Sequence, residues 1–164
     1  MIANRVNRIK PSFTLEMATK AAEMRSKGID VINFSVGEPD FNTPKHICDA
    51  AKNAIDDGYT KYTAGPGMIE ARQAICKKLK RDNGLYYKPK NVLISNGEKQ
   101  SLFTACQALF NPGDRVIVFT PYWVSFPEFV RMADAEPVLI NTLSKNNYEP
   151  DFNDLNKKIN KNIK

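Results

Sequence analysis

The spacing of apolar residues changes near residue 91 of this chain. Before that point they recur three or four positions apart, which is typical of amphipathic helices. Helices are expected over residues 13–27, from Thr43-Pro44 to the stop at Gly58, and from Met68 to Asn83. Between the first two, the apolar run of residues 31–35 is expected to form a short strand.

After residue 91, short apolar runs alternate with helical spacing. The runs cover residues 92–94, 116–119 and 138–140, and the helices between them are expected over 98–110 and 123–134. Such strands, separated by helices, predict an α/β fold whose mostly parallel sheet has helices on both faces. A last amphipathic helix should follow Pro150-Asp151, and the pattern then calls for a further strand. We therefore expect a partial sheet, from the N-terminal part of a larger protein.

Composition narrows the class of protein. The 164 residues are 42% hydrophobic, which is enough for one core. No apolar run approaches the roughly 20 residues of a membrane span, and the first residues lack a secretion signal, so we expect a cytoplasmic protein without membrane contact. The cysteines fall on apolar helix faces and should be reduced core residues; they are Cys48, Cys76 and Cys106. His46 is the only histidine and no metal-ligand spacing exists, so no metal is expected.

The net charge of +6 leaves two interpretations. A basic protein can bind nucleic acid. The alternative is a solvated, lysine-rich surface, which we favour because no basic stripe is interleaved with aromatic residues. No nucleic-acid partner is therefore expected.

The segment Ser95-Asn96-Gly97-Glu98-Lys99 carries the clearest chemistry. It leads from an expected strand through a glycine turn into a helix. The N-terminus of a helix offers N–H groups and the positive end of the helix dipole, which together bind anions. We interpret the segment as a phosphate cup; the alternative is a simple strand-to-helix turn. A dinucleotide site is disfavoured because the G-x-G-x-x-G spacing is absent.

Several such segments stand in a characteristic order. Gly37-Glu38-Pro39-Asp40-Phe41 comes first, then Thr60-Lys61-Tyr62, then the cup, and finally Pro121-Tyr122-Trp123-Val124-Ser125-Phe126-Pro127-Glu128. In this order the set resembles the class I aminotransferases of fold type I. Within them it is most similar to the aspartate aminotransferase branch, which includes aspartate/prephenate aminotransferases. The resemblance extends from Arg5 to about Leu155.

The resemblance implies pyridoxal 5'-phosphate as the cofactor. Backbone N–H groups at Gly97, Glu98 and Lys99 would hold its phosphate, although Glu98 stands where small residues are usual. Trp123 would stack on the cofactor ring and reach a substrate carboxylate with its indole N–H; a core tryptophan is the alternative. Tyr62 would reach the cofactor phosphate of a partner subunit, unless it is simply an exposed loop tyrosine.

The resemblance also implies substrate contacts. Gly37 would bind the amino-acid substrate through its main-chain N–H. Lys10 matches a lysine linked to the second carboxylate of dicarboxylic substrates, and Lys99 is a second candidate. The alternative for Lys10 and Lys99 is that both are ordinary surface lysines, and the sequence does not distinguish the two. Ser35 stands where prephenate-using relatives tend to carry threonine, so prephenate use stays open.

The expected domains are residues 1–45, an N-terminal arm with part of the small domain, and residues 46–164, the first half of the large cofactor-binding domain. In the family, the lysine that binds the cofactor covalently lies further downstream, so we assign no catalytic residue and expect the chain alone to be inactive. For the full-length protein we expect a homodimer that transaminates between aspartate, or a related amino acid, and 2-oxoglutarate. The alternatives are another fold type I enzyme, such as an alanine- or kynurenine-type aminotransferase or a lyase, and a non-catalytic module.

Overall fold

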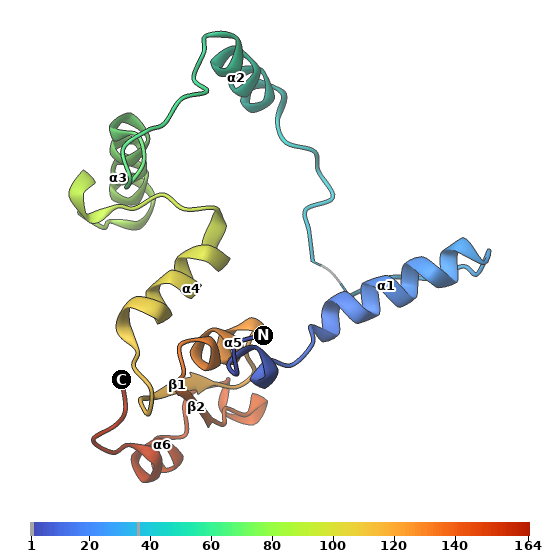
Figure 1. Cartoon of the computed structure of the whole chain (residues 1–164), viewed down its shortest axis with the longest axis vertical. Helices are drawn as coiled ribbons and strands as arrows, with labels where there is room; N and C mark the ends of the chain where they lie inside the picture. The colour runs from blue at the N-terminus through green and yellow to red at the C-terminus, as the bar shows by residue number, and fades with distance from the viewer. Residues whose placement is uncertain (1, 36) are drawn as a thin grey trace. The chain divides into compact units, whose positions relative to one another are not determined.

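The computed structural model describes residues 2–35 and 37–164 (Figure 1). It divides into two compact units. We call Glu38–Gln100 the helical unit, and Met1–Gly37 together with Ser101–Lys164 the sheet unit. Helix α4 (Gly97–Leu109) begins in the first of these and ends in the second.

The helical unit is built from α2 (Lys45–Asp56), α3 (Ile69–Asn83) and the 3-10 turn η2 (Pro89–Asn91). Both helices lie where the apolar spacing predicts them. Pro44 is the N-cap of α2 rather than its first helical residue. Gly84 ends α3 in the left-handed conformation and donates its N–H to Leu79 O, as a glycine C-cap does.

The sheet unit contains two parallel strands, β1 (Arg115–Phe119) and β2 (Glu136–Ile140). The register pairs Arg115 with Glu136 at one end and Phe119 with Ile140 at the other. Helix α5 (Ser125–Met132) connects them and packs against both strands (Figure 1). The parallel pairing across a helical connection confirms the predicted α/β fold.

The core of the sheet unit lies between α5 and the two strands. Its buried apolar side chains are Val118, Val130, Val138 and Ile140, of which Ile140 is fully enclosed. Burial of such side chains is the main source of stability for this layer, at about 1.5–3 kcal/mol each.

The remaining elements of the sheet unit are α1 (Phe13–Ser26), η1 (Val6–Arg8), η3 (Ser144–Asn146) and α6 (Phe152–Lys158). Asp151 caps α6 by accepting hydrogen bonds from two backbone N–H groups of the first turn. On the edge of β1 away from β2, Arg115 donates its N–H to Asn162 O at 2.8 Å and accepts from the N–H of Lys164 at 2.9 Å. Both edges of β1 therefore carry parallel backbone pairing.

Two expected strands do not form. Residues 31–35 and 92–94 are assigned to no strand, and they pair with none among the described residues. Their side chains are largely exposed, Phe34 at 93% and Leu93 at 66%. The prediction was wrong there because a strand needs a hydrogen-bonded neighbour, which apolar spacing alone cannot supply.

The three cysteines are free and half-buried, so they lie less deeply than the predicted core residues. Partial burial raises the pKa of the Cys106 thiol. Among the described residues, no helix has the length and apolar character needed to cross a membrane.

Candidate functional site

The predicted phosphate cup lies in the helical unit, at the start of α4. Gly97 has φ +77°, a left-handed conformation that glycine adopts without strain. Its N–H donates to Ser95 O at 2.8 Å, and the Ser95 hydroxyl donates back to Gly97 O at 3.2 Å. The Asn96 N–H donates to the Gln100 side-chain oxygen at 2.6 Å. The chain thus turns sharply into the helix, with the turn held by its own hydrogen bonds.

The electrostatics of this turn suit an anion. Helix α4 has 13 residues, and the positive end of its dipole lies at Gly97. Gly97 leaves open space where a β-carbon would stand, with no atom within 4 Å apart from its chain neighbours and the backbone of its own helix. Glu98 is exposed, so solvent screens its carboxylate. The residues at this helix start therefore fit a phosphate group, and Lys99 adds a positive charge in the same turn.

Tyr62 lies in the same unit, in the loop between α2 and α3. Its side chain is fully exposed, so it contributes nothing to the packing of this unit. The far end of the same loop is attached to the segment that enters the cup: the Ile94 N–H donates to Pro66 O at 3.0 Å. The structure therefore ties the Tyr62 loop and the cup to one framework.

Trp123 lies in the sheet unit, just beyond the carboxyl end of β1. Its indole meets Phe126 edge-on at 5.6 Å between ring centroids and Phe129 at 6.1 Å. The interplanar angles are 88° and 71°, so neither contact is a face-to-face stack. The side chain remains 41% exposed, which disfavours the alternative of a fully buried core tryptophan. Edge-to-face contacts are a favoured arrangement of aromatic pairs, so they stabilise the ring in this position.

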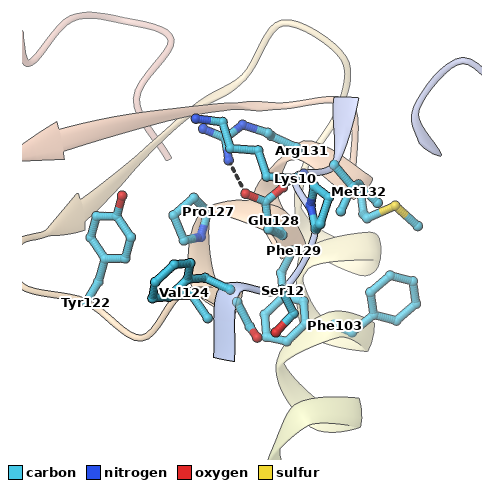
Figure 2. Close-up of a pocket in the computed structure, with 14 residues that line it drawn as sticks. Lys10, Ser12, Phe103, Tyr122, Val124, Pro127, Glu128, Phe129, Arg131 and Met132 are labelled. Carbon is cyan, nitrogen blue, oxygen red and sulfur yellow. Dashed lines mark hydrogen bonds and ion pairs between the residues drawn. The ribbon is translucent and has the colours of Figure 1, made fainter. Parts of the chain in front are cut away.

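Lys10 lies in the N-terminal segment of the sheet unit and is attached to α5. Its backbone N–H donates to a Glu128 carboxylate oxygen at 3.3 Å, while the other oxygen of Glu128 accepts from Arg131 at 2.5 Å. Figure 2 shows these three residues close together. They line a cavity of about 660 Å³, which Tyr122 and Val124 also line. Helix α5 thus contacts two predicted site residues, Lys10 through Glu128 and Trp123 through its two phenylalanines.

A second pair of contacts holds the N-terminal segment. Arg8 donates to the Asp134 carboxylate, and Arg5 lies 4.0 Å from it. Asp134 itself has φ +60°, which is uncommon for a residue with a side chain. Sequence reasoning missed Arg8, Glu128 and Asp134, because no local spacing connects residues more than 100 positions apart.

Gly37 lies at the end of the N-terminal stretch of the sheet unit and is exposed. No atom lies within 4 Å of where its β-carbon would be, so close packing does not explain a glycine there. Its role in substrate binding stays a prediction. The sheet unit therefore carries Gly37, Lys10 and Trp123, and the helical unit carries Tyr62 and the cup.

Comparison with known proteins gives the family. The family model for aminotransferases of class I and II matches residues 29–164. An aspartate aminotransferase of Bacillus sp. (strain YM-2) is 49% identical over 149 residues, which are 91% of this chain and 38% of the relative. The aspartate/prephenate aminotransferase of Thermus thermophilus is 43% identical over 92% of this chain and 39% of its own length.

Solved structures agree with this assignment. The aspartate aminotransferase of Thermus thermophilus with maleate superposes with a TM-score of 0.94 at 41% identity, over all of this chain and 43% of that one. An alanine aminotransferase from Pyrococcus furiosus gives a TM-score of 0.92 at 29% identity, over all of this chain and 42% of its own. The chain thus spans about two-fifths of the length of these relatives, its fold is that of the corresponding part of a fold type I aminotransferase, and it belongs to the aminotransferase class I and II family.

Proposed function

We propose that the full-length protein containing this chain is a pyridoxal-phosphate-dependent aspartate aminotransferase. It transfers the amino group of aspartate, or of a related amino acid, to 2-oxoglutarate. The observation that carries the proposal is the 43–49% identity to aspartate aminotransferases over nine-tenths of this chain. The geometry at the start of α4 also supports a pyridoxal-phosphate-dependent enzyme, since it suits the phosphate of this cofactor.

The cup residues Gly97, Glu98 and Lys99 hold the cofactor phosphate in this proposal. Trp123 supplies an aromatic face to the cofactor ring, at about 0.5–1.5 kcal/mol beyond area burial. When bound, pyridoxal phosphate acts as an electron sink for the substrate carbon. The part of this chain is to bind and orient the cofactor, and no residue of it is assigned as catalytic.

Substrate recognition is proposed for Gly37, Lys10 and the Trp123 indole N–H. A solved relative was crystallised with maleate, a dicarboxylate. Lys10 provides the positive charge that a second carboxylate needs, and its backbone is held by Glu128. The lysine ammonium is a compact charge on a flexible side chain, which suits a contact with a single carboxylate.

We further propose a cytoplasmic homodimer whose subunits share their active sites. Tyr62 is fully exposed in its own unit, which agrees with a role at a partner's cofactor phosphate. A phenol is a suitable neutral donor to phosphate. The division into an arm over residues 1–45 and a large domain from residue 46 stays a prediction.

The test uses the purified full-length protein with aspartate and 2-oxoglutarate. We expect oxaloacetate to form only when pyridoxal phosphate is supplied, and the isolated 164-residue chain to be inactive under the same conditions. Tyr62→Phe should weaken cofactor retention, whereas Tyr86→Phe, on an exposed tyrosine beside Lys80, serves as the matched control. Full activity without added or bound cofactor would contradict the proposal.

An alanine aminotransferase is the second candidate, because the Pyrococcus furiosus enzyme has the same fold over this chain. The same assay separates the two. A kcat/KM for alanine above that for aspartate would favour the alternative, and inactivity on every amino acid despite cofactor binding would favour a non-catalytic module.

A further inference from the structure

Arg72 joins two loops of the helical unit. It lies in the first turn of α3, and its half-buried guanidinium donates from Nε to Gly67 O at 3.1 Å. A second nitrogen, Nη1, donates to Pro89 O at 3.0 Å. One side chain therefore holds the loop that precedes α3 against the turn that follows it.

The loop that Arg72 holds is packed on the segment leading to the cup. Pro66 accepts the Ile94 N–H at 3.0 Å, one residue before Ser95. At Gly67, φ is +97° and a β-carbon would stand 2.8 Å from an Ile94 side-chain atom. That distance is too short for any side chain, so the backbone at Gly67 lies directly against Ile94.

These contacts form a continuous path from Tyr62 to the cup. The Tyr62 loop ends at Gly67, Arg72 fixes Gly67, and Pro66 fixes Ile94 ahead of the turn at Gly97. A guanidinium suits this task because its planar fork presents several donors in fixed directions. The shorter, single-centred lysine ammonium cannot hold both carbonyls in that geometry.

We propose that Arg72 is a positioning residue for binding of the cofactor phosphate. It touches neither cofactor nor substrate, and acts by holding the Tyr62 loop against the segment that enters the cup. This role rests on the proposed function. In a shared-site dimer, it places the cup of one active site and the tyrosine of the other on a single framework.

The test compares two ligands that differ only in the phosphate, pyridoxal phosphate and pyridoxal, in the full-length protein. For Arg72→Met, we expect the dissociation constant of pyridoxal phosphate to rise about tenfold, the equivalent of one charge-assisted hydrogen bond. The dissociation constant of pyridoxal should change less than about twofold. Arg72→Lys should give an intermediate value, because lysine can still reach one of the two carbonyls.

Two further variants test whether the loss of affinity arises from this loop or from a general loss of structure. Gly67→Ala disturbs the same loop through Ile94 and should show the same phosphate-selective loss. Arg81→Met removes another arginine of the same helix, whose guanidinium donates two hydrogen bonds to its neighbour Asp82, and it should leave both affinities unchanged. Urea unfolding shows whether each variant is folded at the assay temperature.

The outcomes separate this role from the proposed function. A wild-type protein that binds both ligands equally overturns the phosphate cup, and the role of Arg72 with it. A wild-type preference for pyridoxal phosphate that Arg72→Met and Gly67→Ala both retain overturns the role of Arg72 alone. Equal weakening of both ligands in these variants also overturns it, since it indicates a general structural effect.

Discussion

Replacing Gly97 with alanine tests whether phosphate binding depends on the turn at the start of α4. Gly97 has φ +77°, and a β-carbon there would meet no atom within 4 Å from outside its own helix and its chain neighbours. The cost of alanine is therefore a backbone cost alone, about 1–2 kcal/mol for a left-handed residue that carries a side chain. The free energy of unfolding is expected to fall by up to that amount, measured by urea denaturation followed by circular dichroism.

The effect on the cofactor follows from the same strain. In the free protein, alanine can relieve the strain by changing φ, which redirects the N–H groups of the turn. Phosphate binding must then restore the turn, so the dissociation constant of pyridoxal phosphate is expected to rise by up to a factor of about 5–30. Titration calorimetry on the full-length protein measures this directly.

Gly58→Ala is the matched control in the same unit. Gly58 also has a left-handed φ, +82°, and open space around its missing β-carbon, but it ends α2 rather than starting the cup. It should lose similar stability and keep its cofactor affinity. Gly97→Asn should recover most of the affinity, since asparagine tolerates the left-handed region better than alanine. An unchanged dissociation constant in Gly97→Ala, or an equal rise in Gly58→Ala, would show that phosphate binding does not depend on the turn at Gly97.

Three further predictions concern stability. Ile140→Ala, at a fully enclosed position between α5 and the strands, should lower the free energy of unfolding by about 2–5 kcal/mol in urea denaturation. Asp151→Ala should cost about 0.5–2 kcal/mol in the same assay, because α6 loses its N-cap, whereas Asp151→Asn should cost much less. The hydrogen bond from Lys158 holds the pKa of Asp154 below its usual value. The ionised carboxylate of Asp154 therefore stabilises the folded state above about pH 4, and this stabilisation is lost as the pH falls through the lower folded-state pKa. The stabilities of wild type and Asp154→Asn, measured by denaturation over a pH series, should therefore converge in acid; a constant difference would contradict this assignment.

The helices could be predicted from the sequence because their signals are local. Apolar spacing and the glycine at position 84 place the end of α3 where the structure has it. The strands at 116–119 and 138–140 were also predictable, since one short helix connects them and brings them into register. The strands expected at 31–35 and 92–94 did not form, because pairing depends on a neighbour that the local pattern does not specify.

The same distinction applies to the site. The turn at Gly97 could be predicted because a glycine stands at the start of an expected helix. The place of Trp123 could be predicted because it closely follows an expected strand. The contacts that hold Lys10 could not be predicted, because Glu128 lies 118 positions away in the sequence. The bridge made by Arg72 was also missed. The sequence separation between Arg72 and Pro89 matches no helix or strand period. The carbonyls of Gly67 and Pro89 come within reach of one guanidinium only when the loops are folded.

A crystal structure of the full-length protein with pyridoxal phosphate would show directly whether the start of α4 binds the cofactor phosphate. We expect the phosphate at the N-terminus of α4, within hydrogen-bond distance of backbone N–H groups of residues 97–99, with the ring against Trp123. A cofactor phosphate bound elsewhere, with the start of α4 left to solvent, would contradict it.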